Sequence, residues 1–186
     1  MNLFDFFTGG SKDNAKTDLS FGEALTGSFA ILCHGDPAVM DEITACLSDT
    51  KAYCETRQDA FDERGLTYNT EAEAWLQLIA AVEAAEGKGY LCERDWKEEA
   101  EEFRWALEKI LRVNGLTFST ERLTFDATKR IPDWAAQFNQ YAGQSGITLY
   151  FIDIDSDSYV MGAAEIADYA CAAEMAGSVG IRITAF

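Results

Sequence analysis

Positively charged residues are scarce in this chain. Its 186 residues include 15 Lys and Arg against 32 Asp and Glu, which gives a formal net charge of −17. A surface of this sign repels nucleic-acid phosphates and anionic membrane head groups, so we expect neither a nucleic-acid-binding protein nor a membrane-surface protein. The same charge allows a basic protein partner or a divalent cation, although strong acidity also serves solubility alone.

The chain also has only one histidine and no closely spaced pair of cysteines. The five cysteines are scattered, odd in number and never spaced as Cys-x-x-Cys, which argues against a zinc site and a disulfide framework. The single histidine, His34, leaves one imidazole base for catalysis, with no nucleophile motif near it. We interpret His34 as a helix-end residue, with metal binding beside an acidic cluster as the alternative.

Long apolar runs are also lacking. No stretch approaches the roughly 18 residues of a membrane span, and the N-terminus lacks the basic flank and long apolar core of a signal peptide. The sequence therefore predicts a cytoplasmic protein with reduced cysteines.

Apolar residues nevertheless make up 48% of the chain, enough for a core without disulfides. We divide the chain into a flexible N-terminal tip and linker at 1–18 and a single α+β domain at 19–186. In this domain, 19–68 is predicted to be helical, and 69–186 is predicted to hold a small mixed or antiparallel sheet packed with helices. The tip is expected to dock on the body of the protein or on a partner through its apolar residues, which are Leu3, Phe4, Phe6 and Phe7.

Capping signals predict the helices of the first part. Ser20 followed by Glu23 is a capping box at the start of an apolar pattern with helical spacing. Asp36-Pro37 is typical of an N-cap and a first helical position. A third helix is expected over about 51–64.

The second part is predicted to alternate helices and strands. Thr70 and Glu73 form a capping box before a helix at about 71–86, and Asp95 is predicted to cap the next helix. The segment 116–125 is strand-like in composition but breaks the alternation. The C-terminal order is predicted as α-β-β-α-β: a helix from Pro132 with Trp134, Phe138 and Tyr141 on one face, a central strand at 147–155, a return strand at 159–161, a helix at 164–175 and a strand at 181–183.

The clearest chemical pattern is Leu149–Tyr159, an apolar run that ends in three carboxylates spaced two apart. On an extended strand, Asp153, Asp155 and Asp157 share one face, which suits a hard cation or, through mutual repulsion, acid–base work. Asp and Ser also form turns that have no further function. A calcium loop is excluded because Ser158 stands where glycine is required. A haloacid-dehalogenase phosphatase is excluded because no lysine follows the motif.

A second cluster, Asp95-Trp96-Lys97, lies where a predicted strand passes into a helix, and it offers an aromatic and cationic contact surface. Trp105 lies on that helix almost opposite its apolar stripe, so it meets either a second element of the fold or a partner. With Tyr159, these residues are the binding candidates.

Three pieces of the chain carry a resemblance: Gly-Tyr-Leu-Cys-Glu-Arg-Asp-Trp-Lys-Glu-Glu, then Phe-Arg-Trp-Ala-Leu, then Ile-Asp-Ile-Asp-Ser-Asp-Ser-Tyr. The chain resembles a family of small bacterial proteins of unknown function over roughly 71–183, without the N-terminal helices. Its signatures are Asp95-Trp96-Lys97 and 153–159. The resemblance implies a bacterial cytoplasmic protein and supplies no reaction.

Two functions of different classes follow. The first is a non-enzymatic protein–protein interaction module, immunity-type or regulatory, with a basic partner and no cofactor. The alternative is a metal-dependent enzyme on a phosphate-containing small molecule, with Asp153, Asp155 and Asp157 as ligands. A third hypothesis is a structural subunit that oligomerises through apolar surface, and the sequence sets no oligomeric state. A pocket lined by both signatures would favour a site.

Overall fold

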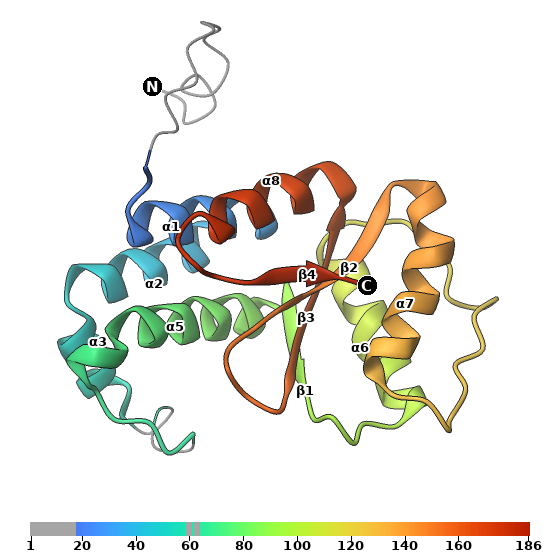
Figure 1. Cartoon of the computed structure of the whole chain (residues 1–186), viewed down its shortest axis with the longest axis horizontal. Coiled ribbons are helices and arrows are strands. Elements are labelled where there is room, and N and C mark those ends of the chain that lie inside the picture. The colour runs from blue at the N-terminus through green and yellow to red at the C-terminus, as the bar shows by residue number, and fades with distance from the viewer. Residues whose placement is uncertain (1–17, 59–60, 62–63) are drawn as a thin grey trace, which may run out of the picture.

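The computed structural model describes residues 18–58, 61 and 64–186 (Figure 1). The elements are α1 (Phe21–Leu32), α2 (Pro37–Ser48), α3 (Thr50–Thr56), η2 (Thr70–Ala72), α5 (Glu73–Lys88), β1 (Leu91–Arg94), α6 (Ala100–Val113), α7 (Ile131–Ala142), η3 (Gly143–Ser145), β2 (Ile147–Ile152), β3 (Tyr159–Glu165), α8 (Ile166–Gly177) and β4 (Ile183–Ala185). The apolar tip lies outside the described residues. None of the helices in the described ranges is long and apolar enough to cross a membrane.

The four strands form one antiparallel sheet in the order β1-β3-β2-β4. Helices cover both of its faces (Figure 1). On one face, α5 and α8 contact the strands, and α1, α2 and α3 pack behind them in the same core. On the other face the sheet packs against α6 and α7. The predicted α+β class, with a helical part before the sheet, is therefore confirmed.

The strand β2 is buried along its whole length because it lies inside the sheet with helices on both sides. Its side chains alternate between the two cores, so that Leu149 and Phe151 face α6 and α7 while Tyr150 and Ile152 face the other helices. A strand buried on both faces shows a continuous apolar run instead of an alternating one. This is the reason for the apolar pattern before the acidic residues.

Local capping signals placed the first two helices correctly. The Ser20 hydroxyl accepts the Glu23 N–H while the Glu23 carboxylate accepts the Ser20 N–H, and Asp36 caps α2 ahead of Pro37. Within the third helix predicted over about 51–64, α3 ends at Thr56, and after a break at Arg57 the described residues Gln58 and Phe61 are again helical.

Two further expectations were wrong, and one open question is answered. The α5 helix has no capping box at Thr70; a short 3-10 turn precedes it, and Asn69 caps that turn. The segment 116–125, which the sequence left ambiguous, forms irregular chain without a strand. In α7, Trp134 and Phe138 are buried, but Tyr141 is exposed.

The 116–125 segment is held without strand pairing. The Arg104 guanidinium donates to the carbonyls of Thr120 and Leu123 at 2.9 and 2.7 Å. The Trp134 indole donates to the Asp126 carbonyl at 2.9 Å. Side chains thus satisfy backbone groups that a ladder would otherwise pair.

A buried hydroxyl in the sheet gives a first testable prediction. Tyr150 is fully buried, and its hydroxyl has no hydrogen-bond partner among the described residues. An unpaired buried hydroxyl loses its hydration without compensation, so Tyr150→Phe is expected to raise the free energy of unfolding by about 1 kcal/mol. The measurement is urea denaturation followed by far-UV circular dichroism.

Tyr53→Phe is the matched control for this substitution. The Tyr53 hydroxyl donates to the Glu42 carboxylate at 2.8 Å, so its removal is expected to cost about 1 kcal/mol. A loss in Tyr150→Phe as large as that in the control would contradict the prediction.

Candidate functional site

The two stretches singled out from the sequence meet at one end of the sheet. Arg94, the last residue of β1, is paired with Tyr159, the first residue of β3. The connection 95–99 and the loop 153–158 therefore leave the sheet side by side (Figure 1). They are neighbours, but neither of the two surface hollows described below is lined by both.

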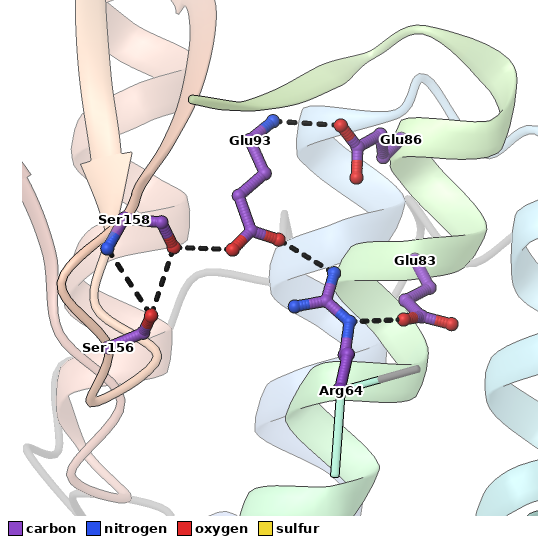
Figure 2. A network of polar contacts seen from close by, with 6 residues as sticks. All are labelled: Arg64, Glu83, Glu86, Glu93, Ser156 and Ser158. Atoms are coloured by element: carbon purple, nitrogen blue, oxygen red, sulfur yellow. Dashed lines mark hydrogen bonds and ion pairs between the residues drawn. The ribbon is translucent and has the colours of Figure 1, made fainter. Parts of the chain in front are cut away.

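A polar network around Glu93 ties this end of the sheet to the helices behind it (Figure 2). Arg64 donates to Glu83 and to Glu93, each at 2.6 Å. The Ser158 hydroxyl donates to the other oxygen of the Glu93 carboxylate. The Glu93 backbone N–H donates to the Glu86 carboxylate at 2.8 Å. One side chain of β1 thus connects α5, the residue Arg64 and the β2–β3 loop.

The Glu93 carboxylate is held in its charged form. Burial by itself raises the pKa of Glu93, but hydrogen bonds from Arg64 and Ser158, with the Arg64 charge, bring that pKa below its ordinary value. The network is therefore a partly buried ion pair with its carboxylate oxygens satisfied. Breaking such an ion pair is costly, because loss of one partner leaves a partly buried charge without compensation.

The Arg94 side chain lies on the opposite face of β1 and links this strand to α6 and to the connection before it. Its guanidinium donates to Glu98 and, at 3.3 Å, to Glu102. The hydrogen bond with Glu98 raises the pKa of Arg94, although burial opposes it. On the same face, the Tyr159 ring packs edge-on against Phe151 with centroids 5.6 Å apart. Tyr159 is thus half-buried against the core, and its ring offers a partner less surface than expected.

Asp95 has a different role from the predicted one. Its carboxylate accepts the Lys97 N–H at 2.7 Å, which closes a turn. The helix α6 begins later, at Ala100, with Glu99 in the N-cap position and no side-chain cap. The prediction that Asp95 caps this helix was wrong, because an aspartate followed by charged residues fits an Asx turn as well as a cap.

The β2–β3 loop does not continue the strand. Asp153 accepts the Asp155 N–H at 2.8 Å and forms an ion pair with Arg182. Asp155 takes a left-handed conformation with φ 58°, which takes it off the extended path. The Ile154 carbonyl between them accepts the Trp75 indole N–H at 2.8 Å. The three aspartates therefore do not share the face that an extended strand predicts.

This geometry corrects the metal hypothesis. In the described part of the chain, no group of three or more His, Cys, Asp or Glu side chains is arranged to hold a metal ion. Asp153, Asp155 and Asp157 form no such group, since the turn separates them and Arg182 neutralises the first. The expected ligand set for a divalent cation is not assembled.

What the two stretches do form is an exposed, negatively charged surface. The carboxylates of Asp95, Glu99, Asp155 and Asp157 are exposed and have no ion-pair partner among the described residues. Trp96, which lies between Asp95 and Glu99 in the sequence, has 43% of its surface exposed. The Lys97 ammonium lies 4.9 Å from the centroid of the Trp96 ring. We call this surface the acidic rim; it comprises Asp95, Trp96, Glu99, Asp155 and Asp157.

Trp105 is not part of the rim. It is 60% exposed on the outer face of α6, and the Lys109 ammonium lies 5.8 Å from its ring centroid. A shallow hollow of about 520 Å³ opens further along this face, lined by Glu108, Arg112 and the chain after α6. Within the described ranges, Trp105 is left exposed and is not covered by a second element of the fold.

Sequence reasoning missed the residues that support the rim. Arg64 lies 29 positions before Glu93, and Arg182 lies 29 after Asp153, so no local pattern links either pair. Trp75 lies inside the helix predicted at about 71–86, and nothing local indicates that its indole binds the acidic loop. The excess of charged residues on both sides of Glu93 was the only available signal.

The fold and the rim define an α+β protein with a two-sided antiparallel sheet and an exposed acidic surface at one end of it. The chain belongs to the family described as Domain of unknown function (DUF6630), whose model matches residues 24–186. The match begins inside α1, so it includes the N-terminal helices that the sequence resemblance left out. No curated protein and no solved structure matches the chain.

Proposed function

We propose that this protein is a non-enzymatic interaction module that binds a basic segment of a partner protein at the acidic rim. The observation that carries the proposal is the set of four exposed carboxylates without ion-pair partners around the half-exposed Trp96. We further propose a bacterial cytoplasmic setting, which the family resemblance and five cysteines without a disulfide support.

The chemistry of the rim suits lysine and arginine side chains. Carboxylates accept charge-assisted hydrogen bonds from guanidinium and ammonium groups. The face of an indole ring attracts the same cations, and Lys97 already occupies one such position at 4.9 Å. The net charge of −17 adds long-range attraction, which raises the association rate of a basic partner more than its final affinity.

The support beneath the rim favours binding over a simple solvated surface. Glu93 pairs with Arg64 on one side of β1, and Arg94 pairs on the other side with Glu98, in the connection before α6, and with Glu102 in α6. The rim loops therefore keep their positions before any partner arrives, and a preorganised surface loses less conformational entropy on binding.

The test compares two variants that each lose three negative charges. Asp95→Asn/Asp155→Asn/Asp157→Asn neutralises the rim and keeps an acceptor at Asp95 and a residue tolerant of positive φ at 155. Binding of a short fluorescein-labelled peptide of alternating arginine and glycine is measured by fluorescence anisotropy. The rim variant is expected to bind about tenfold more weakly than the wild type, because each exposed charge contributes up to about 1 kcal/mol.

The control is Asp41→Asn/Glu121→Gln/Glu174→Gln, which removes three exposed carboxylates from other parts of the surface. It is expected to weaken binding by about twofold through net charge alone. Equal losses of affinity in both triple variants would show that the peptide responds to total charge, and would contradict the proposal. Trp96→Ala separates the aromatic contribution, with binding expected to fall by a further factor of about three.

A further inference from the structure

A groove beside the rim has an apolar interior. Its volume is about 330 Å³, and it lies among the start of α1, the start of α5, the β2–β3 loop and the chain before β4. The apolar residues that line it include Phe21, Trp75, Leu78, Val179 and Ile181. Asp153, Asp155 and Arg182 provide its polar edge. We call it the Trp75 groove.

The walls of the Trp75 groove are fixed. The Trp75 indole is tied to the Ile154 carbonyl at 2.8 Å, and the Asp153 N–H donates to the Arg182 carbonyl at 3.0 Å. Leu78 and Ile181 are buried at the floor, whereas Phe21, Trp75 and Val179 keep part of their surface exposed. A preformed groove with exposed aromatic surface is suited to apolar side chains of a peptide segment.

We propose that the N-terminal segment of this same chain, Met1–Gly10, docks in the Trp75 groove through its apolar residues. Those residues lie outside the described part of the structure, and they are Leu3, Phe4, Phe6 and Phe7. Four apolar residues within the first seven match the apolar lining of the groove, and aromatic rings pack well against Phe21 and Trp75.

The connectivity of the chain supports this occupant. Phe21 is both the first residue of α1 and part of the groove lining, and Asp18 lies only three positions before it. The stretch 8–17 spans at most about 35 Å when fully extended, which is ample to return the segment to a groove that begins at Phe21. A tethered segment reaches an effective concentration of the order of millimolar, so weak contacts are enough to hold it.

Charge does not distinguish this occupant from another, so the apolar match and the connectivity carry the proposal. The stretch between the apolar segment and α1 carries Lys12 and Lys16 together with Asp13 and Asp18, and Arg182 pairs with Asp153 at the edge of the groove. The segment lies before the residues that the family model matches, 24–186. The contact is therefore a property of this chain that its family membership does not supply, and it does not depend on the function proposed for the rim.

Fluorine NMR of the full chain tests this contact. The protein is labelled with 5-fluorotryptophan, and the Trp75 resonance is assigned with Trp75→Phe. In Phe4→Ser/Phe6→Ser/Phe7→Ser, the Trp75 resonance is expected to move and to show a larger solvent isotope shift between H₂O and D₂O. The Trp105 and Trp134 resonances, far along the chain from the groove lining, are expected to stay in place.

A synthetic peptide of residues 1–10, added to the triple-serine variant, is expected to return the Trp75 resonance to its wild-type position. An unchanged Trp75 resonance in the variant, or no response to the peptide, would overturn the proposal. A Trp75 shift that changes with protein concentration, together with a dimer in light scattering, would show docking in a second copy and would also overturn it. Asp5→Asn/Thr8→Ala is the control within the same segment, and it is expected to leave the resonance unmoved.

Discussion

Replacing Gly162 with alanine is expected to lower the free energy of unfolding by about 3 kcal/mol, because the added methyl group overpacks the centre of the sheet. A Cβ at this position would lie 2.4 Å from the Cζ and Oη atoms of Tyr150 and 2.7 Å from Cδ2 of Leu91. The Tyr150 ring has little room to retreat, since it is fully buried and stacked on Tyr169 with centroids 6.0 Å apart. Urea denaturation of the purified variant gives the measurement.

Gly87→Ala is the matched control for Gly162→Ala. Gly87 lies near the end of α5, and no heavy atom stands within 4 Å of the Cβ it would gain. Alanine is the better helix former, so this variant is expected to gain about 0.5–1 kcal/mol. If Gly162→Ala lost less than about 1 kcal/mol, the sheet would have to be more loosely packed around Tyr150 than the structure describes.

The same part of the sheet shows which features a single sequence can reveal. The Ser20–Glu23 capping box, the order of the C-terminal elements and the burial of β2 depend on neighbours within a few positions, and these predictions were confirmed. Gly162 was not singled out, because its role depends on Tyr150 in the adjacent strand. A glycine that makes room for a ring on another strand leaves no local signature.

Boundaries failed where two local signals competed. The strand β2 was expected to reach Asp155, but it ends at Ile152, because Asp153 turns its carboxylate onto the backbone of Asp155. Asp95 was expected to cap a helix and instead closes a turn. Aspartate is favourable in both settings, and the choice is made by tertiary contacts such as the ion pair between Arg182 and Asp153.

The candidate site was predictable in its parts and not in its assembly. Trp96 and the acidic residues on either side of it stood out from composition, as did the loop before Tyr159. That they meet depends on the pairing of Arg94 with Tyr159, and the contact between Glu93 and Ser158 spans 65 positions. A single sequence contains no information on such a pairing. In the assembled geometry, Asp153, Asp155 and Asp157 form no group that could hold a metal ion, and the two stretches form an exposed acidic surface.

Removal of the Arg64 side chain is expected to be the second large effect. Arg64→Met leaves Glu93 half-buried with a charge that no guanidinium compensates, and the free energy of unfolding near neutral pH is expected to fall by about 2 kcal/mol. This figure lies below the cost of breaking a fully buried pair, because the side chains of Arg64 and Glu93 keep 26% and 19% of their surface exposed. The measurement is urea denaturation over a range of pH.

The pH dependence identifies the cause of this loss. The pKa of Glu93 in the folded protein lies below its ordinary value, because the Arg64 and Ser158 hydrogen bonds outweigh burial. The stabilisation is therefore complete above the pKa of an unfolded glutamate and disappears as the pH falls through the folded-state pKa. The difference between wild type and Arg64→Met is expected to shrink over that interval, since a protonated Glu93 no longer needs the arginine.

Arg57→Met provides the comparison that separates the network from charge in general. Arg57 pairs with Glu42, but both side chains are more exposed, at 42% and 37%, so its removal is expected to cost less than about 1 kcal/mol. Both variants change the net charge equally. Equal losses in the two variants, or a loss in Arg64→Met that persists in acid, would contradict the role given to the charged Glu93. A loss confined to Arg64→Met and to neutral pH would instead identify the ion pairs of Arg64 with Glu93 and Glu83 as the contacts that hold the base of the acidic rim in place.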